Sequence, residues 1–437
     1  MQQPNVKVGI MSGTSISFAF AKDYTLDGKT VTGSHTAKLV DGEIEWNGNR
    51  YPSLEFAPVD IADSHFTLID VTIGVNFHWE RKENQSFRGS LRLIVEGDKL
   101  TAVNILPIEE YLLSVISSEM SATASLELLK AHAVISRSWL LAQIDKNKQL
   151  TETATAYCPC TRTDGELVRW FDREDHVNFD VCADDHCQRY QGITRESTET
   201  VRQAIEATWG EVLMDGDKLC DARFSKSCGG VFEEFENCWE PVHHNYLQAR
   251  RDGANPGDFP DLTVEGNARE WILNAPDAFC NTHDARILSQ VLNSYDQETT
   301  DFYRWKVEYS QEELARLVSE RSGEDYGEII DLIPVARGTS GRIYRLKIVG
   351  THKTQIIGKE LEIRRTLSPS HLYSSAFVVE KVGNGEIPDR FIIRGAGWGH
   401  GVGLCQIGAA VMGEKGYNYN QILQHYFVGA KVTKLYQ

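Results

Sequence analysis

Four side chains of types that commonly bind metal lie close together in "HVNFDVCADDHC". Imidazole nitrogen and thiolate sulfur are the ligands that a tetrahedral Zn²⁺ site prefers. The candidate ligands are His176, Cys182, His186 and Cys187. The last two are adjacent, so both can bind one ion only if the chain turns sharply there. Three of these ligands with one outside group, or a reduced thiol pair with surface histidines, are the alternatives.

A candidate acid is Glu119, in "SSEMSATAS", where an amphipathic helical pattern ends. A carboxylate at a helix C-terminus faces the negative end of the macrodipole, and partial burial beside Met120 also disfavours its charge. Both effects raise the pKa, and a carboxyl group that keeps its proton near neutral pH can act as a general acid. A solvated glutamate after a helix is the alternative.

The stretch "GAGWGHGVGLCQIGAAVMG", from Gly395 to Gly413, has no charged side chain and glycine at nearly every second position of its first half. Alternating glycines indicate a backbone that approaches something closely or turns where a Cβ would clash. The spacing differs from a dinucleotide-binding loop, and the composition differs from a membrane span. Such a loop would present His400 and Gln406 to a ligand; a loop packed on its own core is the alternative.

A further candidate functional side chain is that of Arg137, which lies within an otherwise apolar helical segment. A guanidinium group there must meet a carboxylate, carbonyl groups or a ligand. The alternative is an exposed stripe that Arg137 shares with Glu127 and Lys130.

The elements that position these residues follow from the hydrophobic pattern. Residues 1–105 alternate apolar and polar side chains and predict a β-rich part. A helix begins after Pro107 with acidic residues in its first turn, and a second, buried helix begins after Ser125. The helix pair belongs to residues 106–250, which also contain the Cys/His-rich segment and further strands. A helical insertion is predicted over residues 251–330 and includes "ILSQVLNSYDQETTDFYRW". Strands are predicted again in residues 331–437, before the glycine stretch. The fold class is therefore α+β, with a central buried helix pair and a groove beside the helical insertion.

Composition restricts the possible partners. The chain has 437 residues and a net charge of −17, which argues against nucleic acid and against anionic membrane surfaces. No apolar run is long enough for a membrane span, and the first residues do not form a signal peptide, so the chain is cytoplasmic or a processed form of an exported protein.

The nine cysteines are an odd number, which favours reduced thiols or metal ligands over a disulfide framework. Cys158 and Cys160 form a C-x-C pair without a clear partner. The others are interpreted as separate core or loop residues: Cys220, Cys228, Cys238, Cys280 and Cys405.

Five blocks in order resemble the SpoIID/LytB family of stage II sporulation protein D and the amidase enhancers. They are "LPIEEYLLSVISSEMSATASLELLKAHAVISRSWLLAQ", "FSKSCGG", "CWEPVHHNYLQ", "SGRIYRLKIVG" with "LYSSAF", and "GAGWGHGVGLCQIGAAVMGEKGYNYNQILQHYF". The resemblance covers about residues 5–437, with extra length near 250–300. His132, Ser138, Trp139 and Cys405 depart from the residues usual in the family.

The resemblance implies a peptidoglycan lytic transglycosylase, which cleaves between N-acetylmuramic acid and N-acetylglucosamine and leaves a 1,6-anhydro end. Glu119 matches the family's catalytic acid, so any zinc at the Cys/His cluster would be structural. The implied substrate contacts are Arg137, Ser225, Ser227, Trp398, His400 and Gln406. The implied partners are glycan strands or muropeptides at the cell envelope. The alternative is a non-catalytic glycan-binding enhancer of a cell-wall amidase.

Overall fold

The computed structural model of the protein describes residues 2–73, 81–121, 123–153, 160–170, 176–184, 186–195, 198–257, 259–291 and 300–437. The chain folds into two compact units, and it passes between them more than once. Unit 1 comprises Met1–Thr153, Asp175–Met214 and Val432–Gln437, and unit 2 comprises Ala154–Glu174 and Asp215–Lys431. Both units combine helices and strands, which confirms the α+β class.

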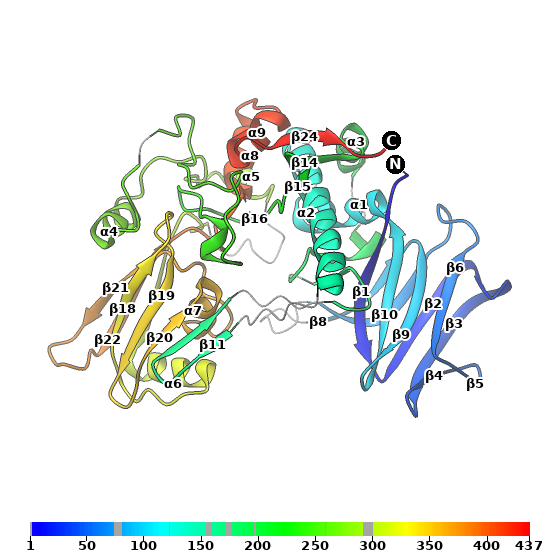
Figure 1. Ribbon diagram of the computed structural model, residues 1–437, viewed down its shortest axis with the longest axis horizontal. Coiled ribbons are helices and arrows are strands. Elements are labelled where there is room, and N and C mark those ends of the chain that lie inside the picture. Colours follow the sequence, from blue (N-terminus) through cyan, green and yellow to red (C-terminus); the bar gives the residue numbers. More distant parts are fainter. Residues whose placement is uncertain are drawn as a thin grey trace. The chain divides into compact units, whose positions relative to one another are not determined.

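A sheet with the strand order β13-β1-β10-β9-β6-β2-β3-β4-β5 dominates the described part of unit 1, and Figure 1 labels its strands from β1 to β5. β7 extends the sheet by pairing with β2 and β8. The predicted alternation is present: in β2, Ile16, Phe18 and Phe20 are buried and the residues between them are more exposed. The strands are β1 (Asn5–Gly13), β2 (Ser15–Leu26), β3 (Lys29–Val40), β4 (Glu43–Trp46), β5 (Asn49–Tyr51), β6 (Ser53–Pro58), β7 (Phe66–Ile73), β8 (Arg81–Phe87), β9 (Ser90–Glu96), β10 (Lys99–Pro107) and β13 (Val181–Cys182).

The predicted helix pair of unit 1 is confirmed as α1 (Ile108–Glu119) and α2 (Leu126–Thr153). α1 begins directly after Pro107, and the Ser125 hydroxyl accepts a hydrogen bond from the Leu128 amide at the start of α2. The two helices pack against each other and against α3 (Glu199–Ala207). Unit 1 also contains the 3₁₀ turn η1 (Gly192–Arg195), most of β14 (Glu211–Asp215) and most of β24 (Lys431–Lys434).

A buried ion pair joins α1 to α2. The Arg137 guanidinium donates to both carboxylate oxygens of Glu109, at 2.7 and 3.0 Å, and to the Glu211 carbonyl at 2.8 Å. Tyr436 and the Gly210 amide also donate to Glu109. The Arg137 side chain is 0% exposed, so the alternative of an exposed stripe with Glu127 and Lys130 is wrong.

Most of unit 2 is built on two sheets with a shared apolar core. Their strand orders are β11-β12-β20-β19-β18 and β17-β22-β21, and β16 pairs with β23 apart from them. The strands are β11 (Cys160–Arg162), β12 (Glu166–Arg169), β15 (Lys218–Leu219), β16 (Phe224–Ser225), β17 (Arg304–Ser310), β18 (Ile329–Arg337), β19 (Ile343–Gly350), β20 (Thr354–Gly358), β21 (Phe377–Val382), β22 (Arg390–Ala396) and β23 (Leu404–Cys405). The helices are η2 (Phe235–Asn237), α4 (Glu265–Asn274), α5 (Ala285–Leu288), α6 (Gln311–Ser322), α7 (Glu360–Thr366), α8 (Gln406–Glu414) and α9 (Tyr419–Tyr426).

The predicted helical insertion at residues 251–330 lies within unit 2 and contains a strand as well as helices. The helix expected over "ILSQVLNSYDQETTDFYRW" is wrong at its end, because residues from Arg304 onward form β17. There Trp305 is buried while Lys306 and Glu308 are exposed, and the strand pairs with β22. Residues 292–299 of that predicted helix lie outside the described part of the chain.

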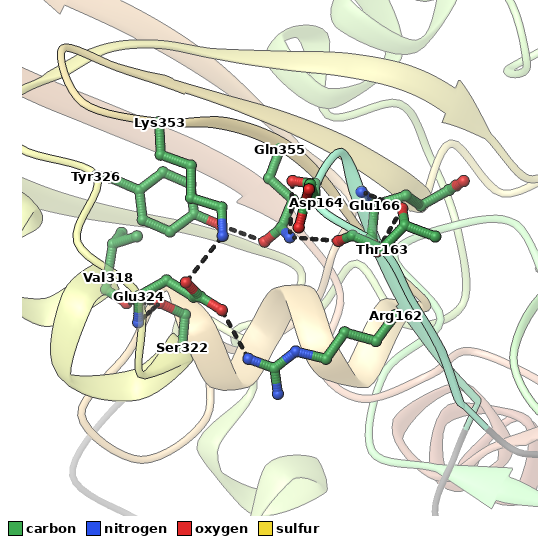
Figure 2. Close-up of polar contacts among 10 residues, drawn as sticks. All are labelled: Arg162, Thr163, Asp164, Glu166, Val318, Ser322, Glu324, Tyr326, Lys353 and Gln355. Carbon is green, nitrogen blue, oxygen red and sulfur yellow. Dashed lines mark hydrogen bonds and ion pairs between the residues drawn. The ribbon is translucent and has the colours of Figure 1, made fainter.

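Polar contacts attach the hairpin of β11 and β12 to the rest of unit 2 (Figure 2). Glu324 accepts from Arg162 at 2.6 Å and from Lys353 at 2.8 Å. The Gln355 amide donates to the Thr163 carbonyl at 3.3 Å and accepts from Tyr326 at 2.8 Å. These contacts, together with the pairing of β12 with β20, make residues 160–169 an integral part of unit 2.

Among the described helices, none combines the length and the apolar character that crossing a bilayer requires.

Two adjacent glutamates on α1, Glu109 and Glu110, provide a test of the buried ion pair between Glu109 and Arg137. Glu109→Gln leaves the Arg137 guanidinium buried without a countercharge, so we expect a loss of about 3–5 kcal/mol in the free energy of unfolding. Glu110→Gln, the matched control, removes only the partly exposed ion pair with Arg88 and should cost about 0–1 kcal/mol. Urea unfolding followed by far-UV circular dichroism measures both, and equal losses would contradict the role of the pair.

Candidate functional site

The four predicted metal ligands converge at one place in unit 1. One ligand atom from each of His176, Cys182, His186 and Cys187 lies within 4.8 Å of the others. The Cys187 sulfur is 3.5 Å from His176 Nε2 and 3.5 Å from His186 Nδ1. The required sharp turn is present, because the Cys187 amide donates to the Asp184 carbonyl. All four side chains are half-buried, and this donor set suits one tetrahedral ion.

Electrostatics within this cluster favour a thiolate. The hydrogen bond with Cys187 is the main cause that holds the pKa of the Cys182 thiol far below its usual range, and both histidines act in the same direction against the effect of burial. The Cys182 amide in turn donates to the Cys187 sulfur at 3.4 Å. Thiolate sulfur is the form that binds metal. Of the C-x-C pair, Cys158 lies outside the described residues, and Cys160 lies in β11 of unit 2.

The segment that follows the cluster runs along α1 and reaches Glu119. The Arg189 amide donates to Glu119 Oε1 at 3.1 Å, and the Gln191 amide donates to the Ser114 hydroxyl at 3.1 Å. Burial raises the pKa of Tyr111 well above its usual range, so its hydroxyl keeps the proton that it donates to the Gln188 side chain. Residues 187–191 are thereby fixed against α1 at several points.

Glu119 is the last residue of α1, and its side chain is half-buried. The next residue, Met120, has an extended backbone and is buried. The carboxyl group therefore stands where the helix stops, with one oxygen oriented by a backbone donor. This placement combines a defined position with access from outside the unit, both of which proton transfer to a ligand requires.

The glycine-rich stretch belongs to unit 2 and encloses a buried arginine. Gly397, Gly399, Gly401 and Gly403 all have positive φ values, from +73° to +93°, which side chains with a Cβ rarely adopt. A Cβ at Gly401 would lie 2.4 Å from the guanidinium carbon of Arg342. That guanidinium group is buried and donates to the carbonyl groups of Gly399 and Cys228. The close approach that the glycines indicate is therefore made to this side chain by Gly397 and Gly401, whereas Gly399 lies against Ser225 and Gly403 against the Arg223 backbone.

Two serines that were predicted to contact the substrate, Ser225 and Ser227, lie beside this glycine-rich stretch. Ser225 ends β16, which pairs with β23 in parallel, and the backbone of Ser227 exchanges two hydrogen bonds with Trp398, at 2.8 and 3.1 Å. Both hydroxyl groups are buried, and neither has a hydrogen-bond partner in the described part of the chain. A buried hydroxyl without a partner is costly, and because neither oxygen has exposed surface, a direct glycan contact is not supported at these two serines.

Trp398 and His400 are half-buried within the same unit. The Trp398 ring packs on Tyr373 and Phe302, with centroids 4.5 and 4.8 Å away. Burial, helped by the charges of nearby arginines, holds the pKa of His400 well below its usual range, so the ring is neutral at pH 7. His400 Nδ1 accepts from the Val402 amide at 3.0 Å, which places the proton of the neutral ring on Nε2.

Two predicted substrate contacts are buried. Gln406 is 1% exposed at the start of α8, and Arg137 is enclosed by its contacts with Glu109 and Glu211. Because the donors of Arg137 have protein partners and its side chain has no exposed surface, a direct glycan contact is not supported there. Glu119 and the Cys/His cluster lie in unit 1, whereas Ser225, Ser227, Trp398, His400 and Gln406 lie in unit 2.

The interpretation of the other cysteines as separate core residues is wrong for three of them. The sulfur atoms of Cys228, Cys280 and Cys405 gather around the carboxylate of Asp252, with ligand atoms that all lie within 4.8 Å of one another. These residues are far apart in the sequence, so no local spacing indicates the group. The one signal in the sequence is Cys405, which departs from the residue usual in the family that the motifs resemble.

Comparison with known protein families matches residues 96–214 to the family described as Stage II sporulation protein. Residues 233–403 match a family described as Domain of unknown function (DUF8618). The first match contains Glu119 and the Cys/His cluster, and the second contains Trp398 and His400. These matches confirm the resemblance to the SpoIID/LytB family that the motifs indicate.

Several curated relatives align with most of the chain. An uncharacterised protein of Brachyspira hyodysenteriae is 25% identical over 347 residues, which are 79% of this chain and 72% of the relative. The amidase enhancer of Bacillus subtilis (strain 168) is 25% identical over 335 residues, 73% of this chain but 40% of that protein's length. Stage II sporulation protein D of the same organism is 21% identical over 336 residues, 76% of each chain.

A pair of glycine substitutions tests the packing around Arg342. Gly401→Ala combines a strained backbone with an overlap against the guanidinium group, so we expect a loss of about 2–4 kcal/mol in the free energy of unfolding. Gly416→Ala, the matched control, has a similar φ of +84° but nothing within 4 Å of the new Cβ. It should cost about 1 kcal/mol from backbone strain alone. Chemical denaturation compares the two, and a smaller loss for Gly401→Ala would contradict this description of the loop.

Proposed function

We propose that this protein is a peptidoglycan lytic transglycosylase in which Glu119 is the acid and base. The observation that carries the proposal is the position of this carboxyl group: it stands at the end of α1, half-buried, with Oε1 oriented by the Arg189 amide. It lies in the segment that matches the stage II sporulation family, in the S-E-M motif whose glutamate is the acid of sporulation-type members.

The reaction needs one carboxyl group used twice. Glu119 donates its proton to the glycosidic oxygen between N-acetylmuramic acid and N-acetylglucosamine, and the C1–O bond breaks as positive charge grows on the muramic acid ring. The resulting carboxylate then takes the proton of the C6 hydroxyl, whose oxygen bonds to C1 and closes the 1,6-anhydro ring. Water is not consumed, so a second carboxylate at the distance that hydrolytic glycosidases require is unnecessary.

The Cys/His cluster lies directly before the segment that orients Glu119, so a metal bound there would hold that segment in place. Zn²⁺ held by His176, Cys182, His186 and Cys187 would cross-link the turn that precedes residues 187–191. Those residues carry the Arg189 amide that orients Glu119. The metal would therefore be structural, and its contribution to catalysis would be a fixed backbone donor.

For glycan binding, unit 2 offers half-buried aromatic rings at Trp398 and Tyr373. Aromatic faces pack against the C–H groups of sugar rings. These contacts also suit the second candidate function, a glycan-binding module that enhances a cell-wall amidase. The relative named amidase enhancer favours that candidate.

Replacing the carboxyl group distinguishes the two functions. Glu119→Gln keeps the side-chain volume but cannot transfer the proton, so we expect release of 1,6-anhydro products from purified glycan strands to fall about 10²- to 10⁴-fold. Glu110→Gln on the same helix is the matched control and should retain activity. Mass spectrometry of the products measures both. Unchanged release by Glu119→Gln would contradict the role of Glu119, and no release by the native protein would favour the amidase enhancer.

The metal can be tested separately at the cluster. Cys187→Ser should lower the zinc content by about one equivalent per chain, because a neutral hydroxyl is a poor ligand in a thiolate site. Cys160→Ser is the control outside the cluster. Elemental analysis gives the metal content, and the activity of Cys187→Ser should fall with it. An unchanged zinc content in Cys187→Ser would exclude this ligand set.

A further inference from the structure

A second group of thiols lies in unit 2, outside the machinery proposed above. It consists of Cys228, Cys280, Cys405 and Asp252, and we call it the Cys3Asp cluster. Each of these side chains is at most 2% exposed. The four come from separate segments: the turn after β16, two loops that flank α4, and the last residue of β23.

The distances within the Cys3Asp cluster match the edges of a tetrahedral metal site. The Cys228 and Cys280 sulfur atoms are 3.5 Å apart, and Cys228 Sγ is 3.5 Å from Asp252 Oδ2. Metal bonds of about 2.3 Å to sulfur and 2.1 Å to oxygen place such ligand atoms roughly 3.6–3.8 Å apart. The two sulfur atoms are too far apart for the roughly 2.05 Å of a disulfide bond.

The two oxygens of Asp252 have different surroundings. Oδ1 accepts from the Tyr426 hydroxyl at 3.1 Å and lies 3.3 Å from His425 Nε2. Oδ2 faces the thiols and accepts from the Cys280 amide at 3.1 Å. Outer contacts of this kind orient a metal-binding carboxylate so that one oxygen is directed to the ion.

The sulfur atoms also receive backbone donors. The Cys228 amide donates to the Cys405 sulfur at 3.2 Å, and the Gly230 amide donates to the Cys228 sulfur at 3.4 Å. Amide donors stabilise negative charge on sulfur, as they do in other metal–thiolate sites. A carboxylate and three thiols that share one buried place have little reason to gather as apolar packing.

We propose that the Cys3Asp cluster is a second metal site, which holds a single thiophilic divalent cation of the zinc type. Three sulfur ligands favour zinc over magnesium or calcium, which prefer oxygen. The compact arrangement suits one ion rather than a multinuclear iron–sulfur cluster. With every ligand supplied by the protein and no exposed position, the ion would be structural. It would join β16, β23 and the loops around α4 into one unit.

The test isolates this site by removing the first one. In a Cys187→Ser background, purified under reducing conditions from zinc-supplemented cultures, we expect about one zinc ion per chain by elemental analysis. Adding Cys280→Ser or Cys405→Ser should abolish it. Adding Cys220→Ser, a buried cysteine of the same unit outside the cluster, should leave it unchanged.

A spectroscopic measurement keeps the test decisive if the double variants fail to fold. The Cys187→Ser protein loaded with Co²⁺ should show the visible absorption of a tetrahedral thiolate site. The absence of both zinc and this absorption from folded Cys187→Ser protein would overturn the proposal. A Cys228–Cys280 disulfide in place of metal, or zinc retained after removal of Cys280 and Cys405, would overturn it as well. None of these results depends on the reaction proposed for Glu119.

Discussion

The hydrogen bond between the Arg189 amide and Glu119 is the contact on which the proposed activity depends. Its acceptor, Glu119, and its donor, the Arg189 amide, are held in place by different parts of unit 1. α1 is a regular helix tied to α2 through Glu109 and Arg137, so its last residue has a defined position. Arg189 follows a tight turn formed by the Cys/His cluster. A carboxyl group positioned in this way loses little freedom when it transfers a proton, which is how preorganisation lowers a barrier.

Each unit contains a buried arginine whose hydrogen bonds compensate for its lost hydration. Arg137 is neutralised by a carboxylate, whereas Arg342 donates to the carbonyl oxygens of Gly399 and Cys228. Gly397 and Gly401 follow from the second arrangement, because a Cβ at either position would overlap the Arg342 guanidinium group. The same stretch also supplies Trp398 and His400, the two half-buried side chains that were predicted to contact a substrate.

The sequence predicted what depends on local spacing. The start of α1 after Pro107 and the convergence of His186 with Cys187 follow from neighbours in the chain, and the α+β class follows from the periodicity. The partner of Arg137 and the Cys3Asp cluster could not be predicted, since their members meet only through tertiary packing. The helix expected to run to Trp305 failed because pairing with β22 imposes a strand there.

The origin of the oxygen at the new sugar ends tests the central claim most directly. Purified glycan strands digested by the native protein in water enriched in ¹⁸O can be analysed by mass spectrometry. If Glu119 delivers the C6 hydroxyl to C1, the new ends are 1,6-anhydro sugars without label. New reducing ends that carry ¹⁸O, or no new ends at all, would contradict the account.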